Sequence, residues 1–128
     1  MRTRAWMVIA GLLCGCTNIQ SYPGTYSGLY SISMNDEPFS DGVPAVATVV
    51  ATASGYEVTI TALPDCEPLP LALVVDHLEQ TSGEWCGDIN VRANAVLPSQ
   101  NTVFDLTIQQ QSPDGLDTID QHFEGRRE

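Results

Sequence analysis

Apolar and polar residues alternate with a period of two along most of the chain after residue 24. This alternation is typical of β-strands that bury one face, and clusters of Gly, Pro, Asn, Asp and Ser separate the alternating segments. The turns fall roughly every 10 to 15 residues, a spacing typical of antiparallel meanders. The sequence therefore predicts an all-β fold over residues 24–128, with an up-and-down meander of about seven or eight strands forming a small barrel or a sandwich.

The expected strands lie where the alternation is clearest, at residues 26–34, 46–52, 57–62, 69–80, 89–95, 104–109 and 119–124. Segment 69–80 is ambiguous, because its apolar residues also fit one face of a helix and Pro70 suits a first helical turn. Strands are expected on both sides of this segment, so we predict a strand here as well.

The first 15 residues have the layout of a secretory signal peptide. Arg2 and Arg4 form a basic start, and residues 5–13 carry no charge. This apolar segment is too short to cross a bilayer, since a spanning helix needs roughly 20 residues. We therefore expect residues 1–15 to direct export and to form no part of the fold.

The end of this segment, Leu13-Cys14-Gly15-Cys16, resembles the lipobox of bacterial lipoproteins. The resemblance implies diacylglycerol transfer to the Cys16 sulfur, cleavage after Gly15 and acylation, for example with palmitate, of the new amino terminus. Cys14 competes for this role, but Cys16 follows a small residue, as the cleavage site requires. If Cys16 is lipidated, residues 16–23 are the lipidated cysteine and a short tether. An ordinary secretory signal is the alternative.

Two cysteines remain after this processing, Cys66 and Cys86, and the exported compartment is oxidising. We expect them to form a disulfide. A metal site is the alternative, but neither cysteine lies in a C-x-x-C motif, and His77 and His122 show no ligand spacing to them.

The processed chain would be strongly acidic. It keeps three arginines and no lysine against 16 acidic residues, a formal net charge of −13. Nucleic acid binding needs a basic surface, so we expect no nucleic acid partner. Anionic lipid headgroups would also repel this surface, which leaves the lipid to hold the protein at a membrane. The acidity favours solubility, and it could also attract a cationic partner.

The opening Gly24-Thr25-Tyr26-Ser27-Gly28 and the ending Phe123-Glu124-Gly125-Arg126 resemble those of small bacterial lipoproteins with a lipocalin-like (calycin-like) meander. Lipocalins open on a G-x-W motif, and Tyr26 stands where the tryptophan would be. The resemblance implies an eight-stranded barrel that holds either packed side chains or one small apolar ligand. It implies no catalytic residues.

Motifs for catalysis, cofactors and metals are not found. Asp76-His77 and Asp120-Gln121-His122 could supply acid–base pairs, but the adjacent Asp76 and His77 would point to opposite faces of a strand, and a surface histidine beside carboxylates is usually only solvated. The acidic turns at 35–41 and 114–120 lack the spacing of a calcium loop. We therefore expect no enzymatic activity, no cofactor and no metal.

Two functions fit these observations. The first is a membrane-anchored envelope lipoprotein that acts as a non-enzymatic, lipocalin-like binding or structural module. The second is an acidic inhibitor or interaction protein for a cationic partner, of the lysozyme-inhibitor type. Thr17, and not Asp, follows Cys16, so the resemblance to lipoproteins implies the outer membrane facing the periplasm, or the cell surface.

Overall fold

The computed structural model describes residues 21–80, 83–97 and 102–128, which form β-strands and no helix. The prediction of an all-β fold is confirmed. None of the described residues form a helix long and apolar enough to span a bilayer. The strands are β1 (Gly24–Met34), β2 (Val43–Thr52), β3 (Gly55–Ile60), β4 (Leu69–Val74), β5 (His77–Gln80), β6 (Glu84–Trp85), β7 (Asp88–Val96), β8 (Val103–Gln111) and β9 (Thr118–Arg127).

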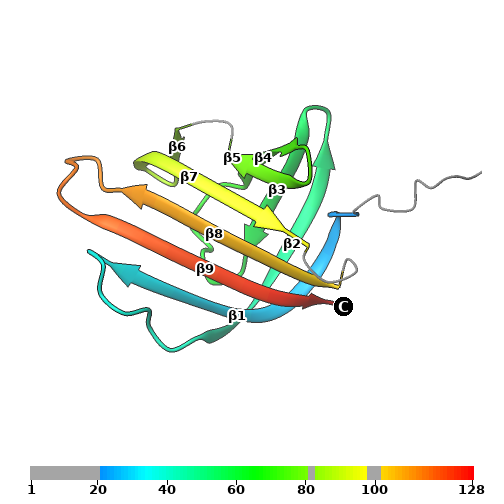
Figure 1. Cartoon of the computed structure of the whole chain (residues 1–128), viewed down its shortest axis with the longest axis horizontal. Helices are drawn as coiled ribbons and strands as arrows, with labels where there is room; N and C mark the ends of the chain where they lie inside the picture. The colour runs from blue at the N-terminus through cyan, green and yellow to red at the C-terminus, as the bar shows by residue number, and fades with distance from the viewer. Residues whose placement is uncertain (1–20, 81–82, 98–101) are drawn as a thin grey trace, which may run out of the picture.

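Eight of these strands close into an antiparallel barrel (Figure 1). Each strand pairs with the next along the chain, β9 returns to pair with β1, and β5 pairs with β7 through Leu78 opposite Ala95. The two-residue strand β6 pairs only with β7 and lies outside the ring. Of the two arrangements that the sequence allowed, the barrel is therefore the one that forms.

The contact between the first and last strands depends on two glycines. Gly28 on β1 lies directly opposite Gly125 on β9. A Cβ atom on Gly28 would collide with the carbonyl oxygen of Glu124, and one on Gly125 would lie 2.6 Å from the ring of Phe123. The glycines of the opening and ending motifs therefore let the two strands approach closely.

Segment 69–80 differs from its prediction. It is a hairpin of two strands, β4 and β5, joined by a turn at Val75-Asp76, so both the single strand and the helical alternative are wrong. Leu69 and Leu71 face the core as expected, but Leu73 is 55% exposed because the alternating pattern continues past the rim of the barrel. A local pattern cannot show where a strand leaves the core.

The end of β1 also differs from its expected pattern. Met34, predicted to face inward, is exposed, whereas Ser33 is buried. The loop after β1 folds back over the outer face, where the Ser33 hydroxyl donates to the carbonyl oxygen of Glu37 and the Ser40 N–H donates to the carbonyl oxygen of Ile32. The loop, and not the barrel interior, buries Ser33.

Large side chains fill the interior of the barrel. The largest of those that are almost wholly buried are Tyr22, Tyr26, Phe104, Phe123, Leu69, Leu78, Leu106 and Ile108. Tyr22 precedes β1, and its hydroxyl donates to the carbonyl oxygen of Asp76 at 3.1 Å. The core therefore begins inside the segment for which the sequence predicts a tether.

Candidate functional site

The loops of an up-and-down barrel alternate between its two ends, and here they segregate the charge. The loops after β1, β3 and β8, together with residues 83–88, lie at one end. Nine of the 16 acidic residues lie there, and these four segments contain no Lys or Arg. We call this the acidic end, and its acidic residues are Asp36, Glu37, Asp41, Asp65, Glu67, Glu84, Asp88, Asp114 and Asp117.

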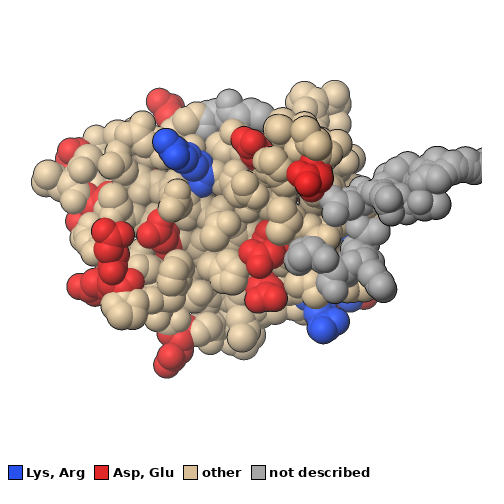
Figure 2. Space-filling view, in the orientation of Figure 1, with Lys and Arg blue, Asp and Glu red and all other residues tan. Residues whose placement is uncertain are grey.

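The opposite end, which we call the amino-terminal end, is nearly neutral. The chain enters β1 here, and the turns 53–54 and 75–76 and the carboxyl terminus lie here as well. Asp76 and Glu128 are balanced by Arg126 and Arg127, the last two residues of β9. Figure 2 shows several red side chains towards the left, the side on which Figure 1 places the loops after β1 and β8, and further red side chains over the middle of this face.

A disulfide between Cys66 and Cys86 fastens two segments of the acidic end to each other, which confirms the predicted pairing. The indole N–H of Trp85 donates to the carbonyl oxygen of Glu67 at 2.8 Å, and the Cys86 N–H donates to the Glu67 carboxylate at 3.1 Å. Hydrogen bonds from the backbone N–H groups of Glu67 itself and of Cys86 lower the pKa of the Glu67 carboxyl. This carboxylate therefore serves a structural role beside the disulfide.

The other two loops of the acidic end are also joined. The Asn35 amide donates to the Asp117 carboxylate at 3.1 Å, and the Thr118 N–H donates to the Asn35 side-chain oxygen at 2.9 Å. Asp114 shapes its own turn, because its carboxylate accepts from the Ser112 hydroxyl and the Leu116 N–H. These two bonds lower the pKa of Asp114, with the Ser112 contribution first. These bonds give Asp114 and Asp117 a role in the turns without a calcium ion.

A chain of polar side chains runs through the core beneath the acidic end. The Tyr30 hydroxyl donates to the side-chain oxygen of Gln121, whose amide donates to Gln110. The Gln110 amide in turn donates to the Asp88 carboxylate. Tyr30, Gln110 and Gln121 are buried, and these bonds satisfy polar groups that would otherwise destabilise the core.

Burial raises the pKa of Tyr30 to about 12, from 10.0. The unfolded chain therefore loses this proton at a lower pH than the folded chain, so the stability that a neutral Tyr30 provides is complete below pH 10 and is lost as the pH rises towards 12. Between pH 8 and pH 11 we expect wild type to lose about 1 kcal/mol more of its free energy of unfolding than Tyr30→Phe does.

Urea denaturation of both proteins at the two pH values measures this difference. Because Tyr30→Phe loses its hydrogen bond to Gln121 at both pH values, that loss cancels in the comparison. Tyr22 and Tyr26, whose pKa values burial also raises, are present in both proteins. Equal losses in the two proteins would contradict the prediction.

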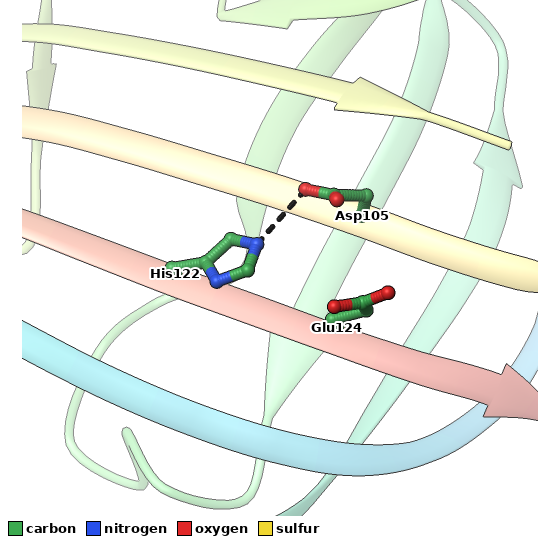
Figure 3. Close-up of side chains that lie close together, drawn as sticks. All are labelled: Asp105, His122 and Glu124. Carbon is green, nitrogen blue, oxygen red and sulfur yellow. Dashed lines mark hydrogen bonds and ion pairs between the residues drawn. The ribbon is translucent and has the colours of Figure 1, made fainter. Parts of the chain in front are cut away.

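A second cluster of titratable side chains lies on the outer face of β8 and β9 (Figure 3). Asp105 lies directly opposite Glu124, and the Nε2 atom of His122 is 3.0 Å from the Asp105 carboxylate. One ligand atom from each of the three side chains falls within 4.8 Å of the others, so together they could hold a divalent cation. His122 and Asp105 are joined by a hydrogen bond, which the dashed line in Figure 3 marks.

This cluster was not predicted, because the sequence places His122 two residues from Asp120 and far from Asp105. Those two residues share a face of β9, but Asp120 lies opposite Gln109, and Asp105 is the carboxylate that reaches the imidazole. Only the register of β8 against β9 places Asp105 beside His122. The signal for this cluster is an Asp on one strand, Asp105, beside an H-x-E motif on the next strand, His122 to Glu124. It can be recognised only when the register of β8 against β9 is known.

The other histidine lies at the amino-terminal end. The two ring nitrogens of His77 are 3.1 Å from the Asp76 carboxylate and 3.0 Å from that of Glu79. The hydrogen bond with Asp76, and then that with Glu79, raises the pKa of His77. His77 and His122 therefore take part in separate pairs. Cys16, the predicted lipidation site, lies outside the described residues.

The outer surface of the barrel has two hollows, and both are lined mainly by polar side chains. Two open hollows of about 420 Å³ each lie over β7 and β8, and both are lined by Arg92 and Gln109. A cavity near the buried Trp85 and Ile108 has only about 10 Å³.

No protein-family profile, curated protein or solved structure matches this chain.

Proposed function

We propose that this chain is a lipid-anchored envelope protein that acts without catalysis, as an interaction module whose acidic end binds a cationic protein. The segregation of charge carries the proposal. Nine carboxylates share one end of the barrel with no Lys or Arg in their loops, whereas the opposite end is nearly neutral. A surface of one sign attracts a partner of the other sign and accelerates their association.

The acidic end also offers what a specific contact needs besides charge. Phe39 and Leu116 are large exposed side chains among its carboxylates, and apolar anchors within a polar rim supply most of the energy of typical interfaces. The disulfide and the bonds between Asn35 and Asp117 hold the loops in place. A surface ordered before binding loses less entropy when the partner binds.

A small apolar ligand inside the barrel, as the lipocalin-like resemblance implies, receives less support. The interior is filled by side chains, and the cavity near Trp85 has room for about one water molecule. Ligand sites in proteins are typically of several hundred Å³. The outer surface is therefore the better candidate for binding.

The lipid on Cys16 completes the proposal. Two or more acyl chains hold a protein firmly at a membrane, whereas one chain binds only marginally. The lipobox-like sequence supports anchoring, and Thr17 after Cys16 supports the outer membrane as the destination. The acidic end would then face away from the membrane, because the chain enters the barrel at the other end.

Binding to lysozyme, used as a cationic protein probe, tests the proposed role of the acidic end. We expect binding at about 20 mM salt that weakens at 200 mM, because ions screen charge pairs beyond about 10 Å at 0.1 M. The triple variant Asp36→Asn, Glu37→Gln, Asp41→Asn should raise the Kd at least about threefold, at roughly 0.2 to 1 kcal/mol per surface charge pair.

The matched control removes the same number of charges elsewhere. Glu57→Gln, Glu124→Gln and Glu128→Gln neutralise three carboxylates that lie outside the loops of the acidic end. We expect this variant to change the Kd by less than about twofold. Equal effects of the two triple variants, or no binding at low salt, would contradict the proposal.

A further inference from the structure

The β4–β5 hairpin ends in three consecutive exposed apolar residues. Val75 is 93% exposed, Leu73 is 55% exposed and Val74 is 39% exposed. We call these three residues the hairpin tip. Exposed apolar side chains are common when scattered singly, but three together on one tip indicate a contact surface.

The backbone of Val75 supports a role for the tip. Its φ is 56°, in the left-handed region that β-branched residues rarely adopt. Gly or Asn would adopt this turn at less cost. A residue that is both strained and almost wholly exposed contributes little to the core, and strained residues cluster at sites of function.

The hairpin tip lies where the chain enters the barrel. The Tyr22 hydroxyl donates to the carbonyl oxygen of Asp76, the residue after Val75, at 3.1 Å. The Arg127 guanidinium donates to the carbonyl oxygens of Ser21 and Pro23, and so fixes the entering chain. Tyr22 follows Cys16 by six positions in the sequence, and six extended residues span about 20 Å at most. A lipid on Cys16 would therefore hold the tip close to a bilayer.

Charge distinguishes this tip from Phe39 and Leu116, two exposed apolar residues in the loops of the acidic end. Phe39 and Leu116 lie among the nine carboxylates of the acidic end, which anionic headgroups would repel. At the amino-terminal end, Arg126 and Arg127 offset Asp76 and Glu128. A bilayer surface therefore meets fewer carboxylates at the hairpin tip, where the exposed Asp76 lies 3.1 Å from the His77 ring, than at the acidic end.

We propose that the hairpin tip is a second membrane contact, in which Val75 and its neighbours enter the interface of the bilayer that holds the lipid. This inference rests on the lipid anchor of the proposed function. It gives the barrel a fixed orientation, with the tip against the membrane and the acidic end pointing away. A lipid on Cys16 attaches the barrel at one point, and the hairpin tip adds a second point of contact.

Quenching of tryptophan fluorescence by brominated lipid tests the inference. The full chain carrying Val75→Trp is produced in a bacterial host that lipidates proteins, and is reconstituted in vesicles of phosphatidylcholine with brominated acyl chains and phosphatidylglycerol. We expect the new tryptophan to lose about half its fluorescence, since interfacial side chains reach roughly 5–10 Å into the boundary of the acyl chains. Leu73→Trp, on the same tip, gives a second reporter if Val75→Trp does not fold.

Leu116→Trp is the matched control, because Leu116 is also an exposed apolar residue in a turn but lies at the acidic end. We expect it to show no more quenching than wild type, whose Trp85 is buried. If the protein floats with the vesicles but both tip reporters behave as wild type, the inference is wrong and the proposed function stands. Equal quenching at Leu116→Trp would also overturn it.

Flotation and the mass of the purified protein separate the two proposals. A protein that lacks the mass of the lipid and does not float with vesicles contradicts the anchor, and the inference about the hairpin tip fails with it. Lysozyme binding by the acidic end is measured without vesicles, so its result does not depend on the tip.

Discussion

Reduction of the disulfide between Cys66 and Cys86 is expected to lower the free energy of unfolding by about 3 kcal/mol. The bond closes a loop across a sequence separation of 20 residues, and so limits the conformations of the unfolded chain. It also joins the loop after β3 to the turn before β7, which β-sheet pairing alone does not connect. A domain of this size has a total stability of roughly 5 to 15 kcal/mol, so the loss is large.

Urea denaturation with and without reductant measures this effect, and the double variant Cys66→Ala, Cys86→Ala repeats it without reductant. The reductant should leave the midpoint of the double variant unchanged, which is the control for effects of the reagent itself. Stabilities of reduced and oxidised wild type that agree within about 0.5 kcal/mol would contradict the prediction, since a typical disulfide contributes 2 to 4.

Replacement of Phe104 by Ala should destabilise the barrel by about 3 to 5 kcal/mol, the usual loss for a buried phenylalanine. Phe104 is 0% exposed. Its ring stacks on that of Tyr26, with the centroids 4.9 Å apart, and lies 6.4 Å from that of Phe123. These three rings connect β8, β1 and β9, so the substitution leaves a cavity where the first and last strands meet.

Leu116→Ala is the control for Phe104→Ala, because Leu116 is 79% exposed and makes little contact with the core. We expect it to change the free energy of unfolding by less than about 0.5 kcal/mol. Phe104→Leu should fall between the two, since it removes less volume. Chemical denaturation of the three variants, analysed as a two-state transition, provides these values. A loss below about 1 kcal/mol for Phe104→Ala would contradict the packing described above.

Most strands could be predicted because the alternation of apolar and polar side chains that marks a strand lies within a few consecutive residues. Residues 104–108 and 91–95 alternate strictly, and the residues predicted to face inward, among them Phe104, Leu106 and Ala93, are buried. Segment 69–80 could not be resolved, because Val75-Asp76 lacks the Gly or Asn of a typical turn and the apolar pattern runs through it. Closure into a barrel could not be predicted either, since it depends on pairing between β5 and β7.

The candidate site was less predictable than the strands. The nine carboxylates of the acidic end are spread over four loops, and they share one end only because every strand reverses direction. The net charge could therefore be counted from the sequence, but the segregation of that charge to one end could not be predicted. The contact of His122 with Asp105 requires the register of β8 against β9, which alternation alone does not determine.

The pairing of β1 with β9 sets a condition on when this protein can fold. The register joins Tyr26 to Arg127 and Met34 to Ile119, so the first strand takes one of its two partners from residues 119–127. Contacts between residues so distant in sequence form slowly. A chain emerging amino terminus first from a ribosome or an export channel cannot complete the barrel until its carboxyl terminus is free. If the chain is exported as proposed above, delayed closure of this kind would keep it unfolded during its passage across the membrane.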